Sequence, residues 1–178
     1  DSGRSSAVGY SRQSGIPFRE GIIPNRYVGR TFIKPTGEAR QAAVRLKLNL
    51  IAEAIEGQRI VIVDDSIVRG TTTRIKMARL RAAGAREIHL RIASPPITDP
   101  CYFGIDFADR EELIANGNTE EEIARQLGVD SVRYLSIDGL KEVVTDEEHP
   151  AHHYCTSCFT GDYRVDVSEA TVRDALGC

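Results

Sequence analysis

One segment, residues 59–84, constrains the fold of this chain most, because a strand pattern, a loop and a helix pattern follow one another in it directly. The apolar run 60–63 ends in two carboxylates, Asp64 and Asp65. A continuous apolar run of this kind is typical of a parallel strand that is buried on both faces. Residues 72–83 then show helical spacing, and Gly84 closes the pattern. The segment therefore predicts a strand followed directly by a helix, and open sheets built from such units bind ligands where the strands end.

The same alternation of strand and helix patterns continues along most of the chain. We expect further strands over residues 18–23, 87–93 and 131–135, and further helices over residues 37–56 and 119–127. Thr119 and Glu122 have capping-box spacing at the start of the last helix. These patterns predict an α/β fold with a mostly parallel, doubly wound sheet and helices on both faces. We assign residues 1–144 to this domain and residues 145–178 to a C-terminal tail that carries a CxxC pair.

Composition narrows the class of protein. Hydrophobic residues make up 41% and charged residues 28% of the 178 residues, which is ordinary for one packed domain and too apolar for a disordered chain. The net charge of −3 gives no basic footprint, so we expect no nucleic-acid partner. No apolar run approaches the ~20 residues of a membrane span, and four cysteines are too few for a secreted disulfide scaffold. We therefore expect a cytoplasmic protein without a membrane partner.

The loop that follows the two aspartates has the composition of a phosphate site. Gly70 lets the backbone approach a ligand, and the first N–H groups of the following helix form an anion site. Ser66, Thr71 and Thr72 add hydroxyl donors. Carboxylates beside such a loop suit sugar hydroxyls and Mg²⁺ rather than phosphate itself. The structural alternative is a strand end with solvated carboxylates and a capped helix start.

The full string from residue 61 to residue 73 resembles the phosphoribosyl pyrophosphate (PRPP) motif of type I phosphoribosyltransferases, in the form found in glutamine PRPP amidotransferases. Residues 25–33 resemble the flexible loop that closes over PRPP in this family, although Pro24 stands where a basic residue is usual. Asp1-Ser2-Gly3 resembles a turn whose hydroxyl residue joins the aspartates at the metal. The resemblance extends from residue 1 to about residue 165, and it implies that the first strand of the sheet lies upstream of Asp1.

The resemblance also implies an enzyme, a glycosyltransferase. Its reaction would make 5-phosphoribosylamine from PRPP and ammonia, the first committed step of de novo purine biosynthesis. The ammonia would come from a glutaminase domain that is absent from this chain. Tetramers and inhibition by purine nucleotides are further family properties. The implied site residues are Tyr27 and Arg30 in the lid, Asp64 and Asp65 at the ribose hydroxyls, Ser2, Asp64 and Asp65 at Mg²⁺, and Ser66, Ile67, Val68, Arg69, Gly70, Thr71 and Thr72 at the 5-phosphate.

The cysteines are the second candidate site. Cys155 and Cys158 form a CxxC pair, and Cys101 lies far from them in the sequence. In family members of the Gram-positive type the matching cysteines bind a [4Fe–4S] cluster, and the fourth family ligand lies upstream of Asp1. Two alternatives remain open: tetrahedral zinc held by these three cysteines with His152 or His153, and free thiols.

Two other functions use the same fold. A regulatory protein could use the loop as a PRPP sensor, but such regulators have a basic nucleic-acid-binding face, which the net charge of −3 disfavours. A phosphoribosyltransferase for a nucleobase would need no cluster cysteines. Cys101 together with the CxxC pair therefore favours the amidotransferase.

Overall fold

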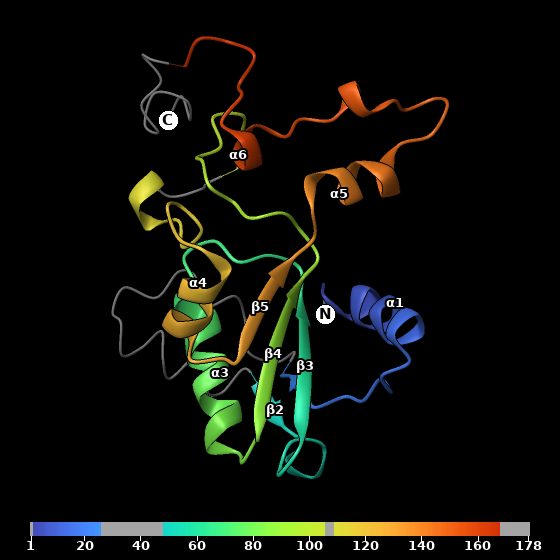
Figure 1. The fold of residues 1–178 in the computed structure, drawn as a ribbon, viewed down its shortest axis with the longest axis vertical. Coiled ribbons are helices and arrows are strands. Elements are labelled where there is room, and N and C mark those ends of the chain that lie inside the picture. Colours follow the sequence, from blue (N-terminus) through green and yellow to red (C-terminus); the bar gives the residue numbers. More distant parts are fainter. Residues whose placement is uncertain (1, 26–47, 106–108, 168–178) are drawn as a thin grey trace.

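A parallel sheet forms the centre of the computed structural model, which describes residues 2–25, 48–105 and 109–167. Its strands are β3 (Arg59–Asp64), β4 (Glu87–Ile92) and β5 (Ser131–Tyr134), and they lie side by side in the order β3-β4-β5 (Figure 1). The register places Asp64 beside Ile92 and Ile92 beside Tyr134, so the three strands end at one edge. These are the three strands expected from the apolar runs at 59–64, 87–93 and 131–135.

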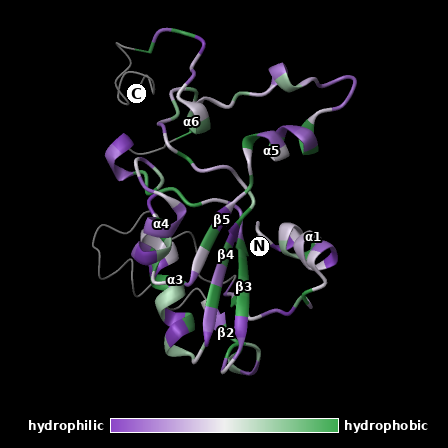
Figure 2. Cartoon of the chain, in the orientation of Figure 1, coloured by the Kyte–Doolittle hydropathy of each residue, from purple (hydrophilic) through white to green (hydrophobic). Residues whose placement is uncertain are grey.

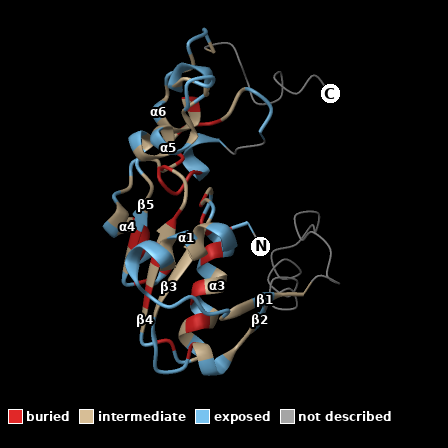
Figure 3. Cartoon of the chain, turned by 90° about the vertical axis from the view of Figure 1, so that its right-hand side faces the viewer, coloured by how far each residue is buried: buried red, intermediate tan, exposed pale blue. Residues whose placement is uncertain are grey.

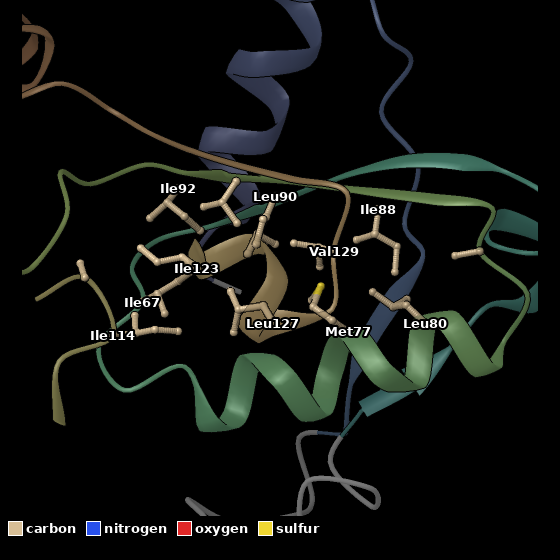
Figure 4. Close-up of a cluster of buried hydrophobic side chains, with 14 of the residues drawn as sticks. Ile67, Met77, Leu80, Ile88, Leu90, Ile92, Ile114, Ile123, Leu127 and Val129 are labelled. Carbon is tan, nitrogen blue, oxygen red and sulfur yellow. The ribbon is translucent and has the colours of Figure 1, made fainter. Parts of the chain in front are cut away.

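Helices cover both faces of this sheet, as expected. α3 (Thr71–Ala82) and α4 (Glu120–Leu127) connect the strands and pack on one face, whereas α1 (Arg4–Ser14) lies beside β3 on the other (Figure 4). The core lies between the sheet and the first two helices. Its fully buried side chains include Met77, Leu80, Ile88, Leu90, Ile123, Leu127 and Val132.

The edge strand β3 and the central strand β4 of this sheet differ in polarity. Strand β3 is apolar along most of its length, whereas polar and apolar residues mix along β4 (Figure 2). In β4, Ile88 and Leu90 are buried in the core, while His89 and Arg91 point to the opposite face and are half-buried. There, His89 Nδ1 lies 2.9 Å from Ser131 Oγ, and Arg91 donates to the same hydroxyl over 3.2 Å. The second face of β4 and β5 is therefore lined by polar side chains.

The capping box expected at the start of α4 is confirmed. The Thr119 hydroxyl accepts from the amide of Glu122 over 3.2 Å, and the Glu122 carboxylate accepts from the amide of Thr119 over 2.8 Å. Gly128 ends the helix in the left-handed conformation. These contacts satisfy backbone groups that the first and last turns of a helix leave unpaired.

Two expectations for the N-terminal half need correction. The strand expected over residues 18–23 is β1 (Ile22–Pro24), and it pairs antiparallel with β2 (Leu48–Leu50) outside the parallel sheet. The helix expected over residues 37–56 is replaced over its second half by β2 and by a short 3-10 helix, η2 (Ala52–Ala54). A short apolar run fits either period, and pairing with β1 decides in favour of a strand. Residues 37–47 of that expected helix lie outside the described residues.

Beyond β5 the chain forms short elements joined by irregular segments. They are α5 (Ile137–Val144), η4 (Ala151–His153) and α6 (Ser157–Thr160). One further short element, η3 (Arg110–Glu112), lies between β4 and α4. Many residues in this part of the molecule are exposed, in contrast to the buried positions beside α3 (Figure 3). Among the described residues, no helix is both long and apolar enough to cross a bilayer.

Candidate functional site

Two aspartates stand at the edge where the parallel strands end. Asp64 is the last residue of β3, and Asp65 begins the loop that leads to α3. Asp64 is partly buried, whereas Asp65 is exposed. The carboxyl edge of an open α/β sheet is the usual place for a ligand. The structure therefore places both carboxylates where the sequence predicts a site.

Neighbouring groups hold both carboxylates in place. Lys76, one turn into α3, lies with its Nζ atom 3.2 Å from Asp64 Oδ2. Partial burial raises the pKa of Asp65, but hydrogen bonds from the Ser2 hydroxyl and the Ser66 amide outweigh this effect and lower the pKa overall. Asp65 is thus ionised at neutral pH, as a metal ligand must be. The contact also brings Ser2 to the aspartates, as the resemblance implies.

The phosphate loop, residues 65–70, ends at Gly70, which is the N-cap of α3. Its φ of 73° lies in the left-handed region, and it has no side chain to cap the helix. The first N–H groups of the twelve-residue helix α3 therefore face the loop together with the positive end of the helix dipole. Thr71 and Thr72 are exposed on this first turn, while Ile67 anchors the loop in the core. This arrangement can bind a phosphate group.

Gly70 also lies against the core so closely that a side chain at this position would require Ile114 to shift. A Cβ atom there would come within 2.4 Å of Ile114 Cδ1 and 3.2 Å of Leu127 Cδ2. Gly57 has a similar φ of 69°, but a Cβ at this position meets nothing within 4 Å. Alanine substitutions at Gly57 and Gly70 therefore separate the free-energy cost of the left-handed backbone from the cost of the contact with Ile114.

We predict that Gly70→Ala lowers the free energy of unfolding by about 2–5 kcal/mol, the sum of ~1–2 kcal/mol for the left-handed backbone and ~1–3 kcal/mol for overpacking. Gly57→Ala should cost only the first part, about 1–2 kcal/mol. Denaturant unfolding of both variants measures the difference. Equal losses would show that the contact with Ile114 is not a constraint on the loop.

The lid residues expected from the sequence, Tyr27 and Arg30, lie outside the described residues. A groove of about 550 Å³ lies between α1, residues 16–24 and the edge of β3 that faces away from β4. This groove reaches Asp64 and Lys76. Most of its lining side chains along β3 are apolar. The loop at Gly70 does not line this groove, and its free helix N–H groups make it the better candidate for a phosphate site.

The cysteines of the second candidate site come from two segments that lie side by side. Cys101 follows β4 after an irregular stretch, and Cys155 and Cys158 flank the start of α6. The amides of Thr98 and Asp99 both donate to the carbonyl of Cys158, over 3.0 and 3.1 Å. The structure thus brings the expected thiols into one region. Among the described residues, however, no group of three or more His, Cys, Asp or Glu side chains is close enough to hold a metal ion.

The two thiols of the CxxC pair differ in acidity. Hydrogen bonds from the side chain and backbone of Ser157 lower the pKa of Cys155, whose Sγ lies 3.3 Å from Ser157 Oγ. Burial and the neighbouring thiols of Cys101 and Cys155 raise the pKa of Cys158 to about 11. The first of these thiols is exposed and the second is partly buried.

We predict that Cys155 is alkylated about ten times faster than Cys158 at neutral pH in metal-free protein. The pKa of Cys158 is about 11 and that of Cys155 lies below the ordinary thiol value, so the thiolate fraction of Cys155 at neutral pH is ~100-fold larger. The more acidic thiolate is also the weaker nucleophile, which offsets about half of this advantage on a logarithmic scale and leaves a rate difference of about tenfold. Iodoacetamide labelling followed by peptide mass spectrometry gives both rates, and the urea-unfolded chain is the control in which they converge. Faster labelling of Cys158 in the folded protein would contradict the assignment.

Sequence reasoning missed several residues that shape these sites. Lys76 pairs with Asp64, and Arg110 forms an ion pair with the buried carboxylate of Asp99. The Tyr163 hydroxyl donates to the carbonyl of Pro100 over 2.7 Å, and its ring lies 5.0 Å from that of Tyr102. None of these pairs is local in sequence, so no spacing rule identifies them.

Comparison with known proteins gives a consistent result. No family model matches the chain. Amidophosphoribosyltransferase from Archaeoglobus fulgidus is 53% identical over 167 residues, which are 94% of this chain and 36% of that protein. The Bacillus subtilis amidophosphoribosyltransferase is 46% identical over 173 residues, 97% of this chain and 36% of the relative. The chain thus spans about a third of the length of the curated relatives it matches.

Solved structures show the same similarity. The glutamine PRPP amidotransferase of B. subtilis in complex with ADP and GMP superimposes with a TM-score of 0.79 at 45% identity, over 97% of this chain and 38% of that one. A structure described as the allosteric regulatory enzyme of purine biosynthesis gives a TM-score of 0.81 at 44% identity, over 97% of this chain and 37% of the other. These matches confirm the expected type I phosphoribosyltransferase fold.

Proposed function

Because the chain is homologous to amidophosphoribosyltransferases over nearly its whole length, we propose that it is the phosphoribosyltransferase portion of such an enzyme. In the proposed reaction, ammonia attacks C1 of PRPP. A C–N bond forms, the C–O bond to pyrophosphate breaks, and the ammonia nitrogen loses a proton. The products are 5-phosphoribosylamine and pyrophosphate. The observation that carries the proposal is the phosphate loop at the strand edge, with Asp64 directly before it and Asp65 as its first residue.

We assign the substrate contacts from this geometry. The amides and hydroxyls of residues 66–72 bind the 5-phosphate, with Gly70 allowing close approach and Arg69 adding a positive charge. Asp64 and Asp65 bind the ribose hydroxyls. Tyr27 and Arg30 belong to the proposed lid. Because ammonia is the nucleophile in the proposed reaction, no side chain has to attack C1, and positioning and charge neutralisation carry the reaction.

Magnesium fits the donor set at the aspartates. Two carboxylates and the Ser2 hydroxyl supply the oxygen ligands that Mg²⁺ prefers, and Ser2 already contacts Asp65. Asp64 must share its carboxylate with Lys76, which lies 3.2 Å away. When bound, the ion would neutralise the charge of the leaving pyrophosphate. Asp65 is the more available ligand, since it is exposed and carries no ion pair among the described residues.

For the cysteines we propose a [4Fe–4S] cluster, with zinc as the alternative. Cys101, Cys155 and Cys158 supply three thiolates, and the fourth ligand would come from outside this chain or, for zinc, from His152 or His153. Two observations support this. The backbone amides of Thr98 and Asp99 bind the Cys158 carbonyl and so bring the two segments together, and the thiols of Cys101 and Cys155, in addition to burial, raise the pKa of Cys158. The cluster would be structural, because the phosphate loop and the aspartates complete the reaction site without it.

We further propose that residues 1–144 form the transferase domain and residues 145–178 a tail that holds two of the cysteines, since α5 ends at Val144. A glutaminase domain elsewhere in the full-length protein would supply the ammonia, and a tetramer is the proposed assembly. Purine nucleotides are proposed inhibitors, since the related B. subtilis structure contains ADP and GMP. We place the protein in the cytoplasm.

The proposal is tested by ligand-dependent thermal stability of the full-length protein. PRPP at 100 times its dissociation constant should add about 2.7 kcal/mol and raise the melting temperature by several degrees. The gain should disappear when Mg²⁺ is chelated. Ribose 5-phosphate serves as a control, because it has the 5-phosphate but lacks the pyrophosphate. If PRPP with Mg²⁺ stabilises the protein no more than Mg²⁺ alone, the loop is not a PRPP site.

A further inference from the structure

One short stretch, residues 110–116, touches both candidate sites; we call it the bridging segment. On one side it contacts the segment that precedes Cys101. The Arg110 guanidinium forms an ion pair with Asp99, whose side chain is only 7% exposed. The side-chain Nδ2 of Asn116 donates to the carbonyl of Thr98 over 3.0 Å. Thr98 and Asp99 are the residues whose amides bind the Cys158 carbonyl, so the bridging segment is tied to the cysteines through one residue pair.

On its other side the bridging segment contacts the phosphate loop. The amide of Ile114 donates to the carbonyl of Val68 over 2.9 Å, and Arg69 Nε lies 2.7 Å from Glu112 Oε2. The buried side chain of Ile114 also packs on Gly70 so closely that a Cβ there would require Ile114 to shift. Ile114 is labelled beside Ile67 in Figure 4, where both side chains reach the core under the loop. The shape of the loop therefore depends on where the bridging segment lies.

The cysteine side of this connection is also firmly packed. Both oxygens of the Asp99 carboxylate would be 3.4 Å from a Cβ at Gly161, directly after α6. Thr98 Oγ1 donates to Asp99 Oδ2 over 2.7 Å, and it also contacts the carbonyl of Phe159 at 3.3 Å. Figure 1 shows α6 beside the stretch that follows β4. A buried carboxylate is stable only when it is paired, and Arg110 supplies the opposite charge for Asp99.

We propose that Arg110 and Asn116 are positioning residues for the phosphate loop, and that through them order at Cys158 and PRPP binding at residues 66–72 are thermodynamically linked. The continuous contact runs from the Cys158 carbonyl to Asp99, Arg110 and the bridging segment, and from Ile114 and Glu112 to Val68 and Arg69. A ligand that orders the loop must then also order the segment around Cys158. In return, disorder of that segment lowers the affinity for the ligand by the same factor. The inference rests on the proposed PRPP site.

Hydrogen exchange of the full-length protein, measured by mass spectrometry with and without PRPP and Mg²⁺, tests the link directly. We expect PRPP to slow exchange at residues 66–72, where it binds, and also at residues 155–163, by about fivefold or more, the lower end of ordinary coupling between sites. The second effect arises at a distance from the ligand. Protection of residues 66–72 without any change at residues 155–163 would overturn the inference and leave the proposed function intact. No protection at either segment would overturn both.

A variant then tests the named residues. Asp99→Asn combined with Arg110→Ala removes the ion pair without leaving a buried charge unpaired. We expect it to raise the KM for PRPP several-fold with little change in kcat, and to abolish the effect of PRPP on residues 155–163. Arg125→Ala is the matched control, because Arg125 is an exposed arginine of α4 paired with Glu122. An unchanged KM together with intact long-range protection would remove Arg110 from the connection. If the double variant does not fold, hydrogen exchange of the unaltered protein with and without PRPP still decides whether the two segments are linked.

Discussion

Asp65→Asn should weaken Mg²⁺-dependent PRPP binding by about 10–100-fold, since a contact of a charged group with its partner is worth ~1.5–3 kcal/mol and each 1.4 kcal/mol is tenfold in affinity. The substitution keeps the size of the side chain and removes the negative charge that the metal needs. The lowered pKa of Asp65 shows that its surroundings already favour the charged form. Calorimetric titration with PRPP, with and without Mg²⁺, measures the loss.

The control for this experiment is Asp138→Asn. Asp138 is an exposed carboxylate in the first turn of α5, and no ligand contact is assigned to it. It should bind PRPP like the unaltered protein. Equal affinity of the Asp65→Asn variant and the unaltered protein would show that this carboxylate contacts neither the metal nor the ribose.

Cys155→Ser should abolish the bound metal of the second site. The full-length protein, purified without oxygen, is expected to be brown and to contain about four iron and four sulfide per chain, as a [4Fe–4S] cluster requires. The variant should be colourless, because a serine hydroxyl is a poor substitute for a thiolate ligand of iron. Iron, zinc and sulfide analysis of both proteins measures the effect.

Cys178→Ser is the control for the cysteine experiment, since Cys178 has no assigned role. It should keep the full metal content. Stoichiometric zinc without iron in the unaltered protein would favour the zinc alternative with His152 or His153. The absence of both metals would leave free thiols, and the structural role proposed for Cys101, Cys155 and Cys158 would be wrong.

The sequence predicts the parallel sheet well, because its signals are local. The apolar run of β3, the aspartates at its end and Gly70 before α3 lie within about a dozen residues, and each has a clear physical meaning. The capping box of α4 is equally local. These segments also contain the candidate phosphate site, so the site could be predicted along with the fold.

The remainder depends on contacts between distant residues. β1 and β2 pair Ile22 with Leu50, and no local pattern identifies that partner, so the apolar spacing around Leu50 was equally compatible with a helix. The ion pairs of Lys76 with Asp64 and of Arg110 with Asp99 form only after α3 and η3 have packed. Charged residues at such positions look like ordinary surface residues in the sequence.

In the proposed reaction the acceptor of the phosphoribosyl group is ammonia. The most direct measurement is pyrophosphate release by the full-length protein from PRPP and Mg²⁺, with ammonia or a purine or pyrimidine base supplied as the acceptor. We predict release with ammonia and none above background with any base, and a lower ammonia-dependent rate for Arg69→Ala, because the phosphate loop loses a positive charge. Pyrophosphate release with a base but not with ammonia would show that the protein is a nucleobase phosphoribosyltransferase instead. PRPP binding without pyrophosphate release with any acceptor would indicate a PRPP sensor.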